Sequence, residues 1–175
     1  MALRITLGDL LHECAEKFGE RPFLIIAETG EALTYREFEA LTNRVAHGLL
    51  DNYSDALSYV DIFLENSVEY LGISYALKKV NAVEVSINPA MRDAPLARMI
   101  DQTGTKLLFT SSQQLSALDQ IRDLIPNVQT LIMLDGADEA RSLFPELEIV
   151  CFEEILSSCE DHIVSPAKDT DVATI

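Results

Sequence analysis

Two short apolar runs joined by one helical segment constrain the fold of this chain more than any other feature. The first run, residues 59–64, leads to Asn66 and Ser67, whose short polar side chains can cap the first turn of a helix. The helix is expected to end at Asn81, because asparagine tolerates the left-handed conformation that terminates helices. A second apolar run, residues 82–87, follows at once. Strand, helix and strand in this order predict a right-handed parallel crossover.

Strands and helices alternate along the rest of the chain. Before the crossover, a helix opening at Thr6 and a hairpin around residues 29–31 precede a helix that begins with a capping box of Thr34 and Glu37. After the crossover the alternation continues, and residues 172–175 look like a strand that has only begun. The pattern predicts an α/β fold with a doubly wound, mainly parallel sheet flanked by helices.

The central helix is expected to turn its apolar side chains toward the core. The residues that carry this expectation are Val68, Leu71, Tyr75 and the run from Leu77 to Val80.

Length and charge limit the classes of function. The 175 residues suit one domain, and 13 basic against 29 acidic residues give a net charge of −16. A field of that sign repels phosphate backbones and anionic lipid, so nucleic acid and membrane surfaces are poor partners. No apolar run approaches the roughly 20 residues that span a bilayer. The N-terminal residues lack a secretory signal pattern, and we expect a cytoplasmic protein.

Histidine and cysteine show no spacing typical of a metal or redox site. The cysteines lack a CxxC pair and are expected to be reduced packing residues. The histidines are scattered, and surface or half-buried roles are expected for each of them. The residues concerned are Cys14, Cys151, Cys159, His12, His47 and His162.

Two carboxylates are unusual because each interrupts an apolar strand. Asp61 and Glu84 would need a partner or a raised pKa if they were buried, and a strand end, an edge or an outward side chain is the preferred explanation. Glu69 and Tyr70 begin a helix beyond a strand's carboxyl end, where open α/β sheets bind ligands, but a polar first turn explains them equally well. Motifs for dinucleotides, phosphate loops and nucleophile elbows are absent from the sequence. No residue is therefore assigned a catalytic, cofactor-binding or metal-binding role.

Several segments together resemble the adenylate-forming (AMP-binding) enzymes, and among them the acyl-CoA synthetases. The resemblance covers nearly the whole chain in the expected order, although each piece alone is weak. The segments that carry it are residues 6–18, 22–24, 33–38, 62–70, 77–83, 87–89 and 101–111. Within that superfamily, the sequence Ile87–Asn88–Pro89–Ala90 looks more like acyl-CoA synthetases than peptide-synthetase adenylation domains.

The sequence departs from the family pattern in places. Leu57 and Ser58 stand where the family usually has Gly-Asp, Asp61 replaces a small apolar residue, and Asn81 replaces glycine. In the family, a segment like residues 171–175 runs into a Ser/Thr/Gly-rich phosphate loop. The resemblance thus implies that residues 1–175 are the N-terminal part of the large domain of a longer ligase, incomplete at the C-terminus.

The resemblance also implies what the parent protein does. Such an enzyme activates a carboxylic acid with ATP to an acyl-adenylate, releasing pyrophosphate, and CoA then displaces AMP to give the thioester. ATP, magnesium and CoA would serve the parent, while this chain carries none of the residues that hold them and is expected to be inactive alone.

Two alternatives remain open. A free-standing α/β interaction or regulatory module could reuse the same fold without catalysis, although an unfinished terminal strand argues against it. A nucleotide-binding flavodoxin-like domain would need a phosphate-holding loop at a strand end, and the sequence offers none. A sheet that lacks its last strands exposes an edge, so self-association through that edge is also expected.

Overall fold

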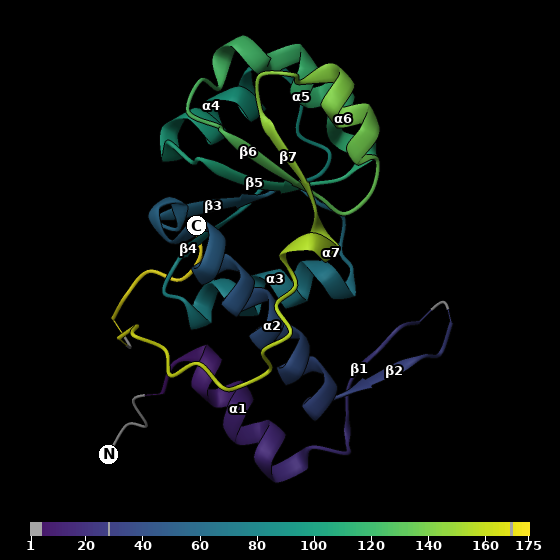
Figure 1. Ribbon diagram of the computed structural model, residues 1–175, viewed down its shortest axis with the longest axis vertical. Helices are drawn as coiled ribbons and strands as arrows, with labels where there is room; N and C mark the ends of the chain where they lie inside the picture. The colour runs from purple at the N-terminus through teal and green to yellow at the C-terminus, as the bar shows by residue number, and fades with distance from the viewer. Residues whose placement is uncertain (1–4, 28, 169) are drawn as a thin grey trace.

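A five-stranded sheet in which all neighbouring strands are parallel forms the centre of the structure (Figure 1). The computed structural model describes residues 5–27, 29–168 and 170–175. The strand order is β4-β3-β5-β6-β7, so the winding reverses between β3 and β5. This order confirms the predicted doubly wound α/β fold. The strands are β3 (Tyr59–Ile62), β4 (Val83–Ser86), β5 (Leu107–Thr110), β6 (Thr130–Met133) and β7 (Glu148–Cys151).

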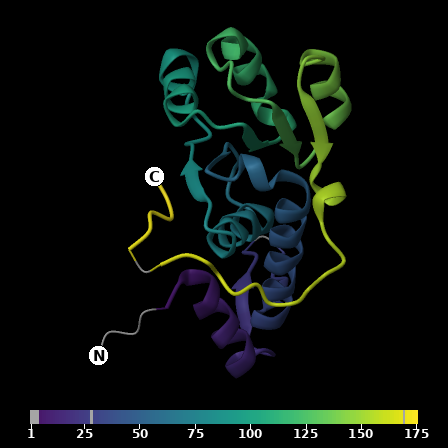
Figure 2. The same ribbon diagram turned by 60° about the vertical axis from the view of Figure 1, so that its left-hand side comes forward.

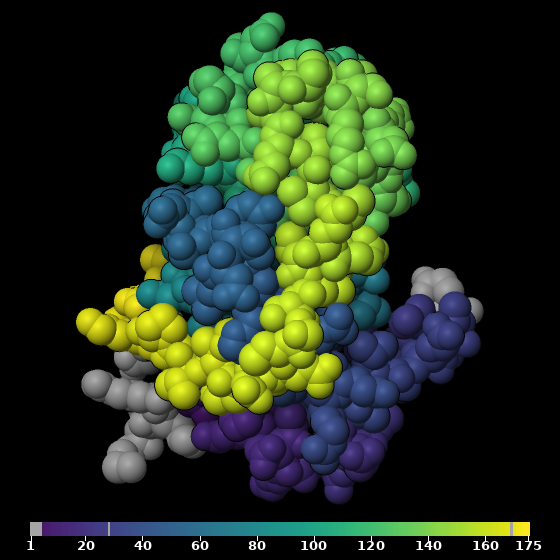
Figure 3. Space-filling view, viewed as in Figure 1, coloured from purple at the N-terminus to yellow at the C-terminus, as the bar shows by residue number. Residues whose placement is uncertain are grey.

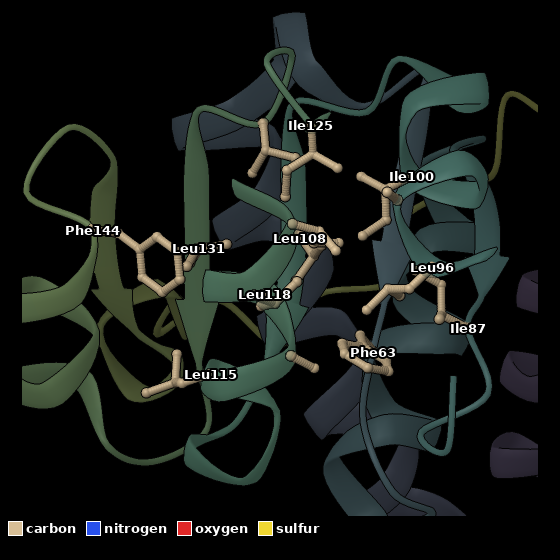
Figure 4. Close-up of a cluster of buried hydrophobic side chains, with 14 of the residues drawn as sticks. Phe63, Ile87, Leu96, Ile100, Leu108, Leu115, Leu118, Ile125, Leu131 and Phe144 are labelled. Carbon is tan, nitrogen blue, oxygen red and sulfur yellow. The ribbon is translucent and has the colours of Figure 1, made fainter. Parts of the chain in front are cut away.

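Helices cover both faces of this sheet because its strands are apolar on both sides. On one face, Phe63, Leu108 and Leu131 contribute to an apolar cluster beneath three helices (Figure 4). On the other face, Val60 and Phe109 lie in a second apolar cluster. The first face is covered by α4 (Asp93–Thr103), α5 (Leu115–Ile121) and α6 (Ala137–Leu143), and the second by α2 (Tyr35–Tyr53), α3 (Val68–Lys79) and α7 (Phe152–Ile155).

The predicted crossover is present as β3, α3 and β4. The Ser67 hydroxyl accepts a hydrogen bond from the Tyr70 amide and caps α3, and Asn81 takes a left-handed φ of 58° after the helix. The expected buried face of α3 is partly wrong. Val68, Leu71 and Tyr75 are only half-buried. Because α3 is packed between the sheet and the helices α1 and α2, its buried residues lie on two sides instead of one. The deeply buried residues of α3 are Gly72, Ile73, Ser74, Ala76, Leu77 and Lys79, of which Leu77 and Lys79 belong to the run that was expected to face the core.

The N-terminal part packs beside α2 and α3 rather than on the sheet (Figures 1 and 2). Its elements are α1 (Leu7–Phe18) and an antiparallel hairpin of β1 (Pro22–Ile25) and β2 (Ala32–Thr34). The predicted caps are confirmed. Thr6 accepts from the Asp9 amide, and Thr34 with Glu37 forms the reciprocal capping box of α2.

The C-terminal segment, residues 156–168 and 170–175, runs from α7 across α2 and α1 (Figure 3) and then back toward β4 (Figure 1), and its described residues form no helix. Gly48 of α2 permits close approach, since a Cβ there would lie 1.6 Å from the Ile155 carbonyl oxygen. The expected strand at residues 172–175 is reduced to one parallel bridge between Thr174 and Glu84. Backbone hydrogen bonds to Glu84 and Ser86 nevertheless place this segment along the outer edge of β4.

None of the helices in the described part of the chain is both long enough and apolar enough to cross a membrane.

Candidate functional site

The position at which ligands bind in open α/β sheets is the carboxyl edge beside the reversal of winding. At this edge the β1–β2 hairpin and the start of α3 enclose a groove of about 660 Å³. Leu24 to Ala27 line one wall, and Asn66 to Glu69 with Leu71 line the other. Glu69 therefore faces the groove, whereas the Tyr70 hydroxyl turns toward Glu84 and Ser86. The groove is mainly apolar, and the charged side chain in its lining is acidic.

Glu84 is buried, so an outward side chain, one of the three expected explanations, is wrong for it. Its carboxylate lies under α3 and accepts hydrogen bonds from Lys78 at 2.5 Å and Ser74 at 2.6 Å, with Tyr70 and Ser86 completing the network. Burial pushes the pKa of Glu84 up, but the hydrogen bonds from Lys78, Ser74 and Ser86 outweigh it and leave the pKa below its ordinary value. The strand-edge part of the expectation is right, because β4 is the outer strand of the sheet.

Asp61 is also buried, and the outward explanation is wrong for it as well. It lies on the interior strand β3, between β4 and β5, on the face covered by α4, and is 0% exposed. Its Oδ1 receives one long hydrogen bond from Thr103 at 3.4 Å, and Oδ2 has no partner among the described residues. Burial raises the pKa of Asp61 to about 8, with Thr103 and Thr105 opposing the shift. The side chain is therefore held largely as the neutral acid at pH 7.

A second buried ion pair joins α2 to α3. Lys79 is 0% exposed and donates to Glu39 Oε2 at 2.7 Å and to Asn43 Oδ1 at 2.6 Å. Burial lowers the pKa of Lys79, while Glu39 opposes that shift. The Asn43 amide also donates to the Glu160 carbonyl oxygen at 2.8 Å, which ties the C-terminal segment to the pair. Sequence reasoning missed this pair, and its one signal was a lysine within an otherwise buried helix face.

Two histidines that are 150 positions apart in the sequence meet beside this pair. The rings of His12 on α1 and His162 in the C-terminal segment stack with centroids 3.7 Å apart and planes 14° apart. Both Nδ1 atoms lie near Glu39 Oε1, at 3.3 Å for His12 and 3.4 Å for His162. Burial, followed by the neighbouring His12, lowers the pKa of His162. The expected exposure of these two histidines is confirmed, but the expectation that the histidines are scattered is wrong for this pair.

The remaining candidates stay apart. His47 contacts the Asp161 carbonyl oxygen at 3.0 Å and lies outside the stacked pair. Each of the three cysteines is a half-buried free thiol in the described part of the chain.

The fold is a doubly wound parallel sheet with α1 and the β1–β2 hairpin packed beside α2 and α3, and an apolar groove lies at the start of α3. Residues 11–175 match the sequence profile described as AMP-binding enzyme. The chain belongs to the AMP-binding enzyme family.

Individual relatives agree with this assignment. The chain is 31% identical over 125 residues to 4-coumarate–CoA ligase 3 of Arabidopsis thaliana, which covers 70% of this chain and 22% of the relative. It is 34% identical over 118 residues to a linear gramicidin synthase of Brevibacillus parabrevis, covering 66% of this chain and 2% of that protein. The crystal structure of the N-terminal domain of FACL13 from Mycobacterium tuberculosis shares the fold with a TM-score of 0.77 and 21% identity, covering 98% of this chain and 41% of that one. The chain thus spans less than a quarter of the length of these two curated relatives.

Proposed function

We propose that this chain is the N-terminal part of an ATP-dependent carboxylic acid–CoA ligase. The observation that carries the proposal is the family match over residues 11–175, supported by the 31% identity to a CoA ligase. In the proposed reaction the acid and ATP give an acyl-adenylate and pyrophosphate, and the CoA thiol then displaces AMP to give the thioester. We place the protein in the cytoplasm.

The described residues do not fit the ATP, magnesium and CoA that this reaction requires. The groove at the carboxyl edge is apolar and carries Glu69, which would repel a triphosphate. At the end of β5 the Ser112 amide already donates to the Asp135 carboxylate at 2.6 Å. We therefore assign those groups to other segments of a longer protein, and this chain acts as scaffold.

The CoA-ligase branch is preferred over the peptide-synthetase branch because of the sequence Ile87–Asn88–Pro89–Ala90. The gramicidin synthase relative shows that similarity extends to that second branch. The motif, rather than overall identity, carries the preference.

An adenylation assay tests the proposal. The purified chain is mixed with ATP, Mg²⁺ and a panel of aromatic and fatty carboxylic acids, and pyrophosphate release is followed with a complete CoA ligase as positive control. We expect no release above the protein-free blank, and acid-dependent release would overturn the scaffold assignment.

A free-standing interaction module is the second candidate, and one observation favours it. Residues 173–175 fold back and hydrogen-bond along the outer edge of β4, so the chain covers part of its own sheet edge. Sequencing the transcript beyond the Ile175 codon separates the two candidates. A Thr/Ser/Gly-rich continuation supports the ligase, and an immediate stop codon supports the module.

Self-association is a further part of the proposal. The β4 edge is only partly covered, and β7 forms the other edge of the sheet. We expect light scattering to show a concentration-dependent rise in mass, and a constant monomer mass at high concentration would contradict it.

A further inference from the structure

Three potential metal ligands from distant parts of the chain converge beside the Glu39–Lys79 pair. His12 comes from α1, Glu39 from α2 and His162 from the C-terminal segment, and one ligand atom of each lies within 4.8 Å of the others. They border a pocket of about 280 Å³ that also contains Glu16 and Glu160. The pocket is thus open enough to admit an ion and its water.

The spacing of these atoms suits a tetrahedral ion. Glu39 Oε1 lies 3.3 Å from His12 Nδ1 and 3.4 Å from His162 Nδ1. Ligands bonded at about 2.0–2.1 Å to a tetrahedral ion are about 3.3 Å apart. Two of the three edges of the ligand triangle are therefore close to the required length before the rings adjust.

One of the ligand atoms lacks another role. Nδ1 of His162 is buried, and its 3.4 Å contact with Glu39 Oε1 is not a hydrogen bond, so the atom has no hydrogen-bond partner among the described residues. A buried polar atom without a partner costs free energy, and an ion bound to its lone pair removes that cost.

The carboxylate of Glu39 is fixed for this purpose. Oε2 receives the Lys79 ammonium at 2.7 Å, which directs Oε1 toward the two imidazoles, and the Asn43 amide contacts Oε1 at 3.3 Å. Such outer contacts orient metal ligands. The charges of Lys79 and of Arg36 in the pocket lining oppose a cation. Asp9, 3.8 Å from His162 Nε2, and the lining residues Glu16 and Glu160 favour one.

Binding requires one change in the structure. The two rings are stacked, so their in-plane lone pairs run nearly parallel and cannot meet on one ion as they lie. Each imidazole must turn about its Cβ–Cγ bond, which is a soft torsion with broad minima. His12 is partly exposed and borders the pocket, so its ring has room to turn.

We propose that His12, Glu39 and His162 form a site for a divalent transition-metal ion of the Zn²⁺ class. Two imidazoles and one carboxylate are the donor set that such ions select over Mg²⁺ or Ca²⁺, and water or a neighbouring carboxylate completes the tetrahedron. The ion would fasten the C-terminal segment to α1 and α2, closing a long loop between residues 12 and 162. Because the site exists only in the folded chain, binding stabilises that chain.

The test uses the whole 175-residue chain and Co²⁺ or Zn²⁺ as probe. Calorimetry with Zn²⁺ and the visible absorption of Co²⁺ are measured for the wild type and for His12→Phe and His162→Ala. His12→Phe keeps an aromatic ring to stack on His162 but removes the ligand atom. His47→Ala is the matched control, because His47 contacts the same C-terminal segment at Asp161 without joining the three ligands.

We expect the wild type to bind one ion per chain with a tetrahedral Co²⁺ spectrum. Binding should be about 10–100-fold weaker in His12→Phe and His162→Ala. In His47→Ala the affinity should stay within about threefold of the wild type. The thermal midpoint should rise with Zn²⁺ in the wild type and in His47→Ala, and not with Mg²⁺. Absence of stoichiometric binding to the wild type, or equal loss in His47→Ala, would overturn the proposal. Circular dichroism of each variant confirms that it is folded, and wild-type affinity in folded His12→Phe and His162→Ala would equally overturn it.

Discussion

The two faces of the central sheet treat a buried carboxylate in opposite ways. Glu84 on β4 points toward α3 and is surrounded by Lys78, Ser74, Ser86 and Tyr70. Asp61, on the adjacent strand β3, points toward α4 and receives one long hydrogen bond. The pKa of Glu84 falls below its ordinary value, and that of Asp61 rises to about 8.

Burial is common to both residues, so burial alone does not set the protonation state. The α2–α3 side supplies cations and hydroxyl donors close to its carboxylates, whereas the α4–α6 side is an apolar cluster with threonine contacts at its margin. A charge is therefore maintained on one face and removed by protonation on the other. The difference gives each face its own response to mutation and to pH.

The largest effect is expected from breaking the Glu39–Lys79 pair on the α2–α3 side. Lys79→Met should lower the free energy of unfolding by about 3–5 kcal/mol, because it leaves the buried Glu39 carboxylate without its cation. Lys78→Met is the matched comparison, since Glu84 keeps Ser74, Ser86 and Tyr70 as donors and should be less affected. Urea unfolding at pH 7 measures both, and a smaller loss in Lys79→Met than in Lys78→Met would contradict the ranking.

Asp61→Asn should give the next largest change in the free energy of unfolding, and this change should be a gain in stability at neutral pH. The folded pKa of Asp61 is about 8 against 3.8 for the ordinary group, so the wild type loses stability as the pH rises from about 4 to about 8. The free energy of unfolding of the wild type should fall by at most about 1.4 kcal/mol per pH unit. The loss of stability between pH 5 and pH 7 is then about 2–3 kcal/mol. The asparagine variant should lack this loss and become increasingly more stable than the wild type.

Unfolding curves at several pH values for Asp61→Asn check this expectation. Asp101→Asn, at an exposed position on α4, provides the control. Its free energy of unfolding should change with pH in the same way as that of the wild type. A constant difference between Asp61→Asn and the wild type from pH 5 to pH 8 would show that Asp61 is ionised throughout.

The sequence predicts the fold because the relevant signals are local. Apolar runs, the Ser67 cap, the Thr34–Glu37 capping box and the reversal at Asn81 each act within a few residues, and the structure confirms them. Asp61 and Glu84 were also recognisable, since each breaks an apolar strand.

The partners of these carboxylates were not predictable from the same information. Lys78 and Lys79 are adjacent and identical, yet a rotation of about 100° along the helix sends one to Glu84 and the other to Glu39. His12 and His162 meet only because the C-terminal segment returns across α1 and α2. These contacts depend on tertiary packing, which no local pattern records.

Glu84→Gln should give the smallest of these effects and sharpen the contrast with Asp61. At pH 7 the change leaves Lys78 without its counter-charge and should lower the free energy of unfolding by about 1–2 kcal/mol. Because the folded pKa of Glu84 lies below 4.5, its contribution is present above that pH and is lost as the pH falls through the folded pKa. The deficit of Glu84→Gln should therefore shrink on acidification from pH 6 to pH 3. If it grew instead, Glu84 would be a protonated acid like Asp61, and the two faces would not differ in the way that their contacts require.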